Sequence, residues 1–173
     1  SIKEKIKEIV FMGGAAMCLG NTTPSAEFNI YVDPHAANIV LSSGIPLTMM
    51  GLDVTHQVNV NKKVIKSMNE NNNKSSKFFG ELMEFYTIFH KKLYETEDTP
   101  LHDPCVIAYL LDPNIFSGKF VNVKVEENSE LTRGETVVDW LGVTNRKRNC
   151  FVMNNANEKK FFELLKNKLS ILP

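Results

Sequence analysis

Polar side chains between residues 21 and 29 are of the types that bind sugar hydroxyls. Asn21 and Asn29 offer amide donors and acceptors, and Glu27 places one carboxylate between them. Each hydroxyl of a cis-diol both donates and accepts a hydrogen bond, so a mixed amide and carboxylate set suits it. The same residue types also suit a capped surface loop, because Asn, Thr, Pro and Ser favour turns. The pattern therefore indicates either a hydroxyl-binding loop or a structural turn.

His102 and Asp103 form a second pair of chemical groups, directly before Pro104. Asp103 suits a helix start, with a carboxylate at the N-cap and proline at the first helical position. It equally suits a hard oxygen ligand for calcium, with His102 beside it as a proton donor. The pair alone leaves both interpretations open.

The first third of the chain predicts the elements that position these groups. Residues 9–12 are a short apolar run that ends in Gly13-Gly14, as a buried strand entering a loop does. Asp33-Pro34 begins a helix, and residues 45–50 form a second apolar strand. Strand, helix and strand with short links make a βαβ unit. We therefore predict an α/β fold with a mostly parallel, open, Rossmann-like sheet flanked by helices, which binds ligands at the carboxyl ends of its strands.

Helices dominate the middle of the sequence. Asn61 can cap a polar helix that reaches about residue 69, and residues 70–76 form a polar loop. A longer helix over residues 77–94 carries apolar side chains over a wide arc, so it must be covered on two sides. A further helix is predicted over residues 104–111.

In the last third of the sequence, the spacing of apolar residues changes to every second position. Residues 121–125 alternate apolar and polar, and residues 136–138 and 150–153 are further strand candidates. We predict an antiparallel strand section here, near the C-terminus, followed by an amphipathic helix over residues 157–169. No linker is long enough to divide the chain, so a single domain over residues 1–173 is expected.

The composition limits the classes of partner. Hydrophobic residues make up 43% and charged residues 23% of the 173 residues, as in ordinary soluble globular proteins. Twenty basic and twenty acidic residues cancel, so no overall field favours nucleic acid or an anionic membrane. Cys18, Cys105 and Cys150 are scattered, which favours reduced thiols and a cytoplasmic location. The expected partner is a small molecule or another subunit.

Two longer stretches carry a specific resemblance. Residues 20–34 read Gly-Asn-Thr-Thr-Pro-Ser-Ala-Glu-Phe-Asn-Ile-Tyr-Val-Asp-Pro, and residues 100–104 read Pro-Leu-His-Asp-Pro. They resemble the central and C-terminal signatures of the nucleoside hydrolases, in the order that this family has them. Residues 51–56 and 132–134 fit the same family. The chain is thus similar to the C-terminal portion of an inosine-uridine preferring nucleoside N-ribohydrolase.

The resemblance implies roles around the sugar. Asn21, Glu27 and Asn29 would hold the ribose hydroxyls, with Phe28 beside the sugar ring. Asp103 would coordinate calcium, and that ion would also bind the 2′- and 3′-hydroxyls and the attacking water.

The resemblance also implies roles around the base. His102 would sit by the departing base and protonate it, and Tyr86 would lie near the base on a mobile helix. The family often carries an aromatic or an amide residue at the position of His90, so histidine there leaves the base preference open. A partly buried helix face is the alternative interpretation of Tyr86 and His90.

For the whole chain, the resemblance implies hydrolysis of the N-glycosidic bond of ribonucleosides, with calcium as cofactor and a role in purine or pyrimidine salvage. It also implies a homo-oligomer, either a dimer or a tetramer. Neither a Gly-x-Ser-x-Gly elbow nor a cysteine with an obvious histidine partner occurs, which disfavours a covalent nucleophile.

One part of the family pattern is absent from the sequence. The family's other calcium ligands and its general base come from a cluster of the form Asp-x-Asp-x-x-x-Asp-Asp, which does not occur here. A single carboxylate binds calcium weakly, because affinity follows the number and charge of the ligands. Two hypotheses follow: the C-terminal portion of a hydrolase that needs its N-terminal half, or a non-catalytic ribonucleoside-binding or assembly module. In either case we expect an exposed sheet edge, uncovered apolar helix faces and self-association.

Overall fold

The structure is a computed structural model that describes residues 2–94 and 99–173. The chain forms two compact units. The first comprises residues 1–55 and 116–155, and the second comprises residues 56–115 and 156–173. The single domain expected over residues 1–173 stays a prediction.

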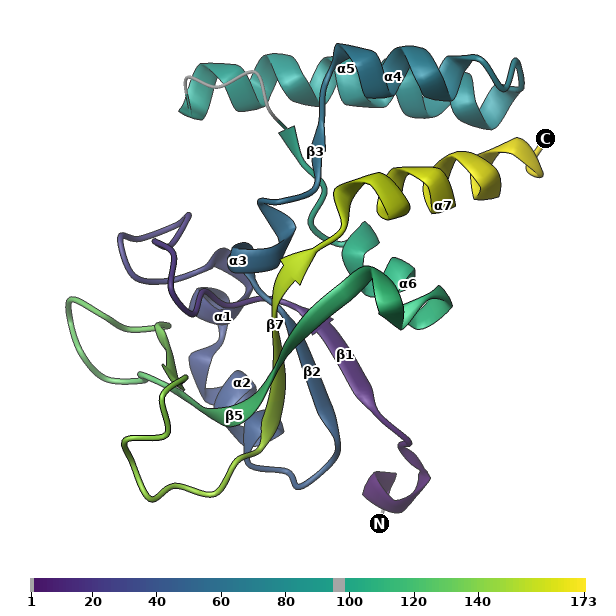
Figure 1. Cartoon of the computed structure of the whole chain (residues 1–173). Coiled ribbons are helices and arrows are strands. Elements are labelled where there is room, and N and C mark those ends of the chain that lie inside the picture. Colours follow the sequence, from purple (N-terminus) through teal and green to yellow (C-terminus); the bar gives the residue numbers. More distant parts are fainter. Residues whose placement is uncertain (1, 95–98) are drawn as a thin grey trace. The chain divides into compact units, whose positions relative to one another are not determined.

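The first unit is built on one five-stranded sheet with helices beside it (Figure 1). Its strands are β1 (Ile9–Met12), β2 (Leu47–Met50), β5 (Phe116–Val125), β6 (Thr136–Asp139) and β7 (Cys150–Ala156). Its helical elements are η1 (Ile2–Lys5), α1 (Phe28–Val32), α2 (Pro34–Leu41) and α3 (Leu52–Thr55). The predicted α/β fold is confirmed.

The strand order is β1-β2-β7-β5-β6. β1 and β2 pair in parallel, which confirms the βαβ unit that they form with α2. β5 and β6 are antiparallel, as predicted, but β7 pairs with β2 in parallel, with Val152 opposite Met49. The prediction that residues 150–153 are antiparallel is therefore wrong for this pairing. A period of two identifies a strand, but it does not identify a partner about a hundred residues away.

Local signals explain where α2 begins and ends. The Asp33 side chain accepts a hydrogen bond from the backbone N–H of Ala36 at 2.9 Å, as an N-cap does, and Pro34 follows it. Gly44 lies after the helix with φ of +81°, a conformation that side chains with a Cβ disfavour. The second strand begins at Leu47, two residues later than predicted.

The core of the first unit lies between the sheet and its helices. Nine buried apolar residues form it, from α1, α2 and the three strands β2, β5 and β7. They are Ile30, Leu41, Leu47, Met49, Val121, Val123, Val125, Cys150 and Val152. β1 lies at the end of the strand order, and all four of its residues are only half-buried. The expected exposed edge is therefore present at β1.

The second unit combines helices with a two-stranded antiparallel ladder. Its elements are β3 (Asn59–Val60), α4 (Lys62–Asn69), α5 (Lys74–Tyr94), β4 (Thr99–Pro100), α6 (Pro104–Leu111), η2 (Pro113–Ile115) and α7 (Glu158–Ser170). α4 and α5 lie side by side, α7 contacts both of them, and α6 contacts α7 (Figure 1).

Side-chain caps set two of these helix starts. The Asn61 side chain accepts hydrogen bonds from the N–H groups of Lys63 and Val64, as predicted. Asn157 caps α7 in the same way through the N–H of Lys160. α5 begins at Lys74, three residues before the predicted start, so the polar loop is shorter than expected.

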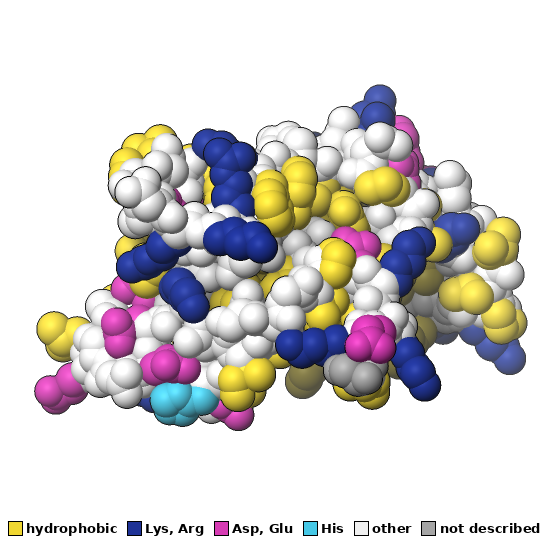
Figure 2. Space-filling model, turned by 90° about the horizontal axis from the view of Figure 1, so that it is seen from below, with side chains coloured by type: hydrophobic (Ala, Val, Ile, Leu, Met, Phe, Trp, Pro, Cys, Tyr) yellow, Lys and Arg dark blue, Asp and Glu magenta, His cyan; other side chains and the backbone are white. Residues whose placement is uncertain are grey.

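Charges of both signs are interspersed with apolar side chains on the face drawn in Figure 2, as the zero net charge leads one to expect. Within residues 2–94 and 99–173, no helix has the length and apolar character needed to cross a membrane.

Candidate functional site

In the first unit, the loop that follows β1 is held by side chains that accept from its backbone N–H groups. The Glu27 carboxylate accepts from Gly14 at 3.0 Å, and the Thr136 hydroxyl accepts from Ala15 at 2.9 Å. Asp53 accepts from the next three N–H groups, those of residues 16–18, at 2.6, 2.8 and 3.1 Å. These donors are already occupied, most of them by carboxylates of other elements, so the loop does not present them to a phosphate.

Close packing explains the glycine at position 14. Its φ is +84°, and an added Cβ would lie 3.0 Å from Met49 and Thr136 side-chain atoms. Glycines that follow a strand can let a ligand approach the backbone closely. At Gly14 it is instead protein side chains that approach.

Glu27 joins this loop to α1. The residue is 2% exposed, and its carboxylate also accepts from the backbone N–H groups of Asn29 and Ile30, at 3.0 and 3.3 Å. Glu27 is therefore the N-cap of α1 as well as the anchor of Gly14. Three backbone donors fix the position of the carboxylate, so any ligand hydroxyl that reaches it meets a pre-oriented acceptor.

The other predicted ribose-binding residues gather at the same helix start. The side-chain oxygen of Asn21 accepts from the N–H of Phe28 at 2.9 Å, which closes the loop onto α1. The Asn29 amide group lies 3.4 Å from the carbonyl oxygen of Met12, at the end of β1. Phe28 is 56% exposed, and Asn29 is exposed as well. The four predicted residues thus lie together beside the carboxyl end of β1.

The residues around Gly134 brace α1 from another side. The Arg133 guanidinium donates to the carbonyl oxygen of Tyr31 at 3.1 Å and lies 5.3 Å from the centroid of the Tyr31 ring. Gly134 has φ of +85°, and a Cβ there would lie 2.8 Å from the Cα of Tyr31. Residues 132–134, which fit the family pattern, therefore position the helix that carries Phe28 and Asn29.

In the second unit, Asp103 precedes Pro104 but does not cap α6. Its side chain makes no cap hydrogen bond, and its φ of −60° and ψ of −36° are already helical. A capping aspartate has an extended backbone, so the capping interpretation is wrong for this side chain. The carboxylate is exposed, and its oxygens are suited to a cation or a hydroxyl.

His102 is half-buried beside Asp103. Burial, and then the neighbouring His56, lowers the pKa of His102 to about 4, although Asp103 opposes this shift. Its imidazole is therefore uncharged at neutral pH. The His56 and His102 rings lie edge to face, with centroids 5.7 Å apart. His56 was not predicted as a site residue, because only the fold brings it to His102.

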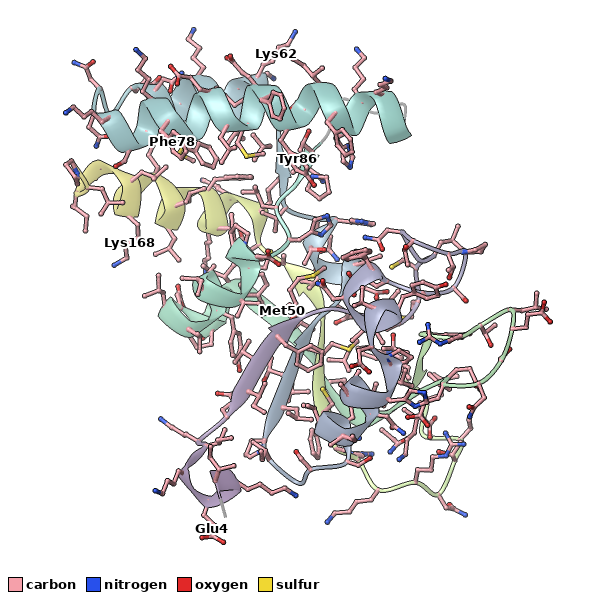
Figure 3. The ribbon with its side chains drawn as sticks, turned by 180° about the vertical axis from the view of Figure 1, so that it is seen from behind. Glu4, Met50, Lys62, Phe78, Tyr86 and Lys168 are labelled. Carbon is pink, nitrogen blue, oxygen red and sulfur yellow. The ribbon has the colours of Figure 1, made fainter. Side chains whose placement is uncertain are left out.

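Tyr86 and His90 are four residues apart on α5 and project from the same side of it; Tyr86 is labelled in Figure 3. Their ring centroids are 6.0 Å apart, and His90 is only 8% exposed. Burial lowers the pKa of His90, and His90 in turn contributes to the lowered pKa of His102. These two residues form a partly buried helix face, and they lie in the same electrostatic neighbourhood as His102.

None of the three cysteines has the properties of a nucleophile. Burial raises the pKa values of Cys18, Cys105 and Cys150 to about 12, with Asp53 adding to the shift at Cys18. The thiols are free and protonated at neutral pH, and only a thiolate attacks efficiently.

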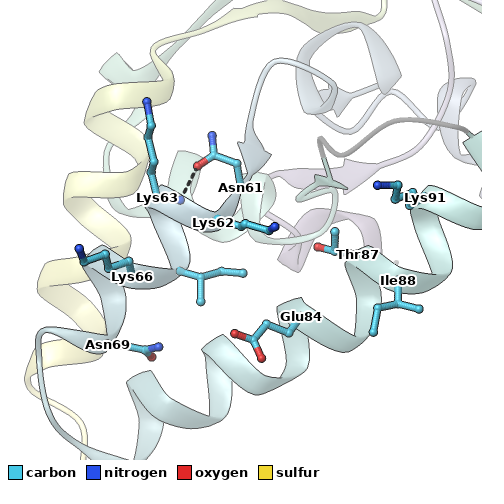
Figure 4. A pocket seen from close by; sticks show the side chains of 10 residues that line it. Asn61, Lys62, Lys63, Lys66, Asn69, Glu84, Thr87, Ile88 and Lys91 are labelled. Atoms are coloured by element: carbon cyan, nitrogen blue, oxygen red, sulfur yellow. Dashed lines mark hydrogen bonds between the residues drawn. The ribbon is translucent and has the colours of Figure 1, made fainter.

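Two grooves of the second unit have linings of different character. A groove of about 860 Å³ between α4 and α5 is lined by four lysines, Glu84 and apolar side chains, and by none of the predicted site residues (Figure 4). Its basic rim does not match an uncharged nucleoside. A smaller groove of about 410 Å³ between α6 and α7 is lined mainly by apolar residues, with Asp103 at its edge.

The Asp103 carboxylate is one of the side chains whose chemistry suits calcium. Asp103 supplies an exposed carboxylate oxygen, the ligand type that calcium prefers. Within the described ranges no three His, Cys, Asp or Glu side chains gather in a way that could hold a metal ion. Calcium takes six to eight oxygen ligands, so the Asp103 carboxylate alone does not make up such a site.

The first unit thus carries polar side chains beside a strand end of an α/β sheet, and the second unit carries an exposed carboxylate next to His102. The sequence matches the family model of the inosine-uridine preferring nucleoside hydrolases over residues 1–163. The chain belongs to this family, as the two signatures predicted.

Relatives and solved structures agree with this assignment. The chain is 45% identical over 170 residues to a pyrimidine-specific ribonucleoside hydrolase, RihA, of Shewanella oneidensis, covering 98% of this chain and 53% of the relative. It resembles the structure of a purine-preferring ribonucleoside hydrolase from Gardnerella vaginalis, with a TM-score of 0.86, 32% identity, and coverage of 98% and 54%. A plant nucleoside hydrolase gives a TM-score of 0.88 at 26% identity, with coverage of 98% and 55%. The chain thus spans about half the length of these relatives.

Proposed function

We propose that this chain provides the ribose-binding and leaving-group residues of an enzyme that hydrolyses the N-glycosidic bond of ribonucleosides to ribose and free base. The observation that carries the proposal is the Asp103 carboxylate, which is exposed and makes no cap hydrogen bond although it stands at a helix start. The names of the relatives, which are ribonucleoside hydrolases, support the substrate class.

The chemistry explains why these residue types are needed. Hydrolysis joins a water oxygen to C1′ of the ribose and breaks the bond from C1′ to the base nitrogen. Positive charge develops on the ribose ring as that bond breaks, so nearby carboxylates stabilise the transition state. One proton must reach the departing base, and one must leave the water.

In this proposal the amide groups of Asn21 and Asn29 and the carboxylate of Glu27 bind and orient the ribose hydroxyls. Phe28 packs against the sugar ring, where it excludes water. The amides donate and accept, as hydroxyl groups require. The backbone bonds that hold Glu27 in place support this role.

On the base side, His102 donates a hydrogen bond to the departing base, which takes its proton from water, and Tyr86 and His90 contact the base. The uncharged state of His102 suits this position, because a neutral imidazole carries one N–H donor without a permanent positive charge beside the developing one. Asp103 would hold calcium, which when bound lowers the pKa of its water and so supplies the nucleophile. The carboxylate that takes the proton from the water lies outside this sequence.

Three free thiols support a reducing compartment, so a cytoplasmic location and a role in nucleoside salvage are part of the proposal.

A second candidate is a ribonucleoside-binding or assembly module without catalysis. What favours it is that, among the residues described, no group of three metal-binding side chains occurs. Such a module would bind ribonucleosides through the residues around Glu27 and leave the glycosidic bond intact.

One assay separates the two candidates. Inosine and uridine are incubated with calcium and the chain, alone and mixed with the part of the Shewanella oneidensis relative that this chain does not match. We expect ribose release only from the mixture. Asp103→Asn should lower it at least ~100-fold, equivalent to about 2.7 kcal/mol of transition-state stabilisation. Asp33→Asn, at the Asp-Pro start of α2, is the matched control and should retain activity.

Each other outcome has a defined meaning. Binding of either nucleoside without turnover in any mixture would support the module. Turnover by the chain alone would refute the statement that the general base lies outside it. If the assay shows no binding and no turnover, both candidates are ruled out.

A further inference from the structure

A two-stranded ladder in the second unit brings His56 to His102. Its strands, β3 and β4, pair antiparallel, and the backbone N–H of Leu101 donates to the carbonyl oxygen of Val58 at 2.9 Å, which continues the pairing by one residue. His56 lies two residues before Val58, and His102 directly follows Leu101. The ladder therefore leads both histidines to the same end, although they are far apart in the sequence.

Further hydrogen bonds hold the backbone of both histidines. The Asn59 side chain donates to the carbonyl oxygen of His56 at 2.7 Å. The backbone N–H of Cys105 donates to the carbonyl oxygen of His102 at 3.1 Å. Since the main chain is held at both positions, the direction of the His102 ring is set by rotation about its own side-chain bonds and by the groups that the ring touches.

The imidazole rings of the two histidines pack against each other. Their centroids are 5.7 Å apart and their planes meet at 62°, which is an edge-to-face arrangement. His102 is half-buried, and His56 is exposed. A His102 ring that turned out of its position would strike the His56 ring, so the contact restricts the rotation of His102.

The orientation of the His102 ring matters because an imidazole is not symmetric. A half-turn about the bond from Cβ to Cγ exchanges the place of Nε2 with that of Cε1, and the place of Nδ1 with that of Cδ2. A substrate atom that meets a nitrogen in one orientation meets a C–H group in the other. A ring that turns freely would thus offer its hydrogen bond to the departing base for only part of the time.

We propose that His56 is a positioning residue, whose ring holds the His102 imidazole in the orientation that directs a nitrogen toward the departing base. His56 acts through His102 and does not itself touch the substrate. The catalytic meaning of this role rests on the proposed function, whereas the orientation of the ring is a property of the chain alone. Because an aromatic edge is what the contact requires, phenylalanine can replace His56.

The first test follows the His102 ring by NMR in the chain without substrate. Nuclear Overhauser effects between the Hβ and Hδ2 protons of His102 should fit one ring orientation in the wild type. They should fit a mixture of two orientations in His56→Ala, and one orientation again in His56→Phe. His35→Ala, which removes an exposed histidine of α2, is the matched control and should leave the His102 ring as it is. Circular dichroism checks that all variants remain folded.

The second test uses ribose release by the mixture of this chain with the unmatched part of the Shewanella oneidensis relative. His56→Ala should lower kcat at least ~10-fold and change KM by less than ~3-fold, because the bond to the base strengthens as the base departs. His56→Phe should recover most of the loss, and His35→Ala should show none.

A double-mutant cycle separates positioning from a general effect on the fold. In the same mixture, His56→Ala should add no further loss to His102→Ala, since a residue that acts through another has no effect once the other is gone. Losses that add would overturn the proposal, because His56 would then act independently of His102.

The two tests also separate this role from the proposed function. If the wild-type mixture shows no turnover, the proposed function fails, and the ring measurement still decides whether His56 orients His102. A single ring orientation in His56→Ala, or a loss of activity in His56→Ala that phenylalanine does not recover, would contradict the positioning role.

Discussion

Asp33 and Asp103 both stand before a proline at the start of a helix, yet their side chains act differently. Asp33 accepts a hydrogen bond from Ala36 and caps α2. Asp103 has a helical backbone conformation, and its carboxylate makes no cap bond. The same local sequence therefore stabilises a helix start at one position and leaves a carboxylate exposed at the other. Functional sites are where departures from a local rule are expected, which supports the proposed role of Asp103.

This difference predicts a difference in stability. Asp33→Ala should lower the free energy of unfolding by about 0.5–2 kcal/mol, because a cap bond is lost. Asp103→Ala should lower it by less than ~0.5 kcal/mol, since an exposed side chain without a cap bond is removed. Urea unfolding of both variants measures the two values. Equal losses would show that Asp103 caps α6 in solution.

At the scale of elements, the loop after β1 depends on a carboxylate from α3. Asp53 accepts from three successive N–H groups, those of residues 16–18. Asp53→Ala should therefore expose these amides, and their hydrogen exchange should quicken at least ~10-fold, as expected for the loss of about 1.4 kcal/mol of protection. The amide of Gly14, which Glu27 holds, is the internal control. Unchanged exchange at residues 16–18 would mean that other contacts hold the loop.

The segment after β6 contains a pH-sensitive turn. The Thr144 hydroxyl and then its backbone N–H donate to Asp139, and these bonds lower the pKa of that carboxyl. A carboxyl whose pKa is lower in the folded state stabilises the fold above its unfolded pKa, about 3.9, and loses this effect as the pH falls through the folded value. Wild type should thus be more stable than Asp139→Asn at pH 7. The difference should shrink below about pH 4 in urea titrations at several pH values, and a difference that does not vary with pH would contradict this account.

The elements also show what a sequence can predict. The start of α4 at Asn61 and the extent of α6 were predicted correctly, because caps and prolines act within a few residues. The parallel pairing of β7 with β2 was not predicted, since strand partners are set by packing across the whole unit. The predicted residues Asn21, Glu27 and Asn29 do gather, because one short segment carries them. His56 was missed, since it meets His102 only through the fold.

At the scale of the whole molecule, the chain corresponds to only part of the sequence of its relatives. It spans about half of their length, and its sequence has no Asp-x-Asp-x-x-x-Asp-Asp cluster. The β1 edge and the apolar side chains of α5 are both exposed, and such surfaces are ones on which further protein can pack. In the proposed function, recognition of the sugar and activation of the water are thus assigned to different parts of the fold.

This separation predicts how the chain responds to calcium. A ligand that binds only the folded state stabilises it by RT ln(1 + [L]/Kd), and a lone carboxylate such as Asp103 gives a Kd well above the ~1 mM of the weakest dedicated sites. Calcium at ~1 mM should therefore add less than about 0.4 kcal/mol, and the midpoint of thermal unfolding should move by no more than about 2 °C. A chelator should have equally little effect. A larger shift that Asp103→Ala abolishes would show that this chain completes a calcium site without the aspartate cluster, and the general base would then have to be sought among its own carboxylates.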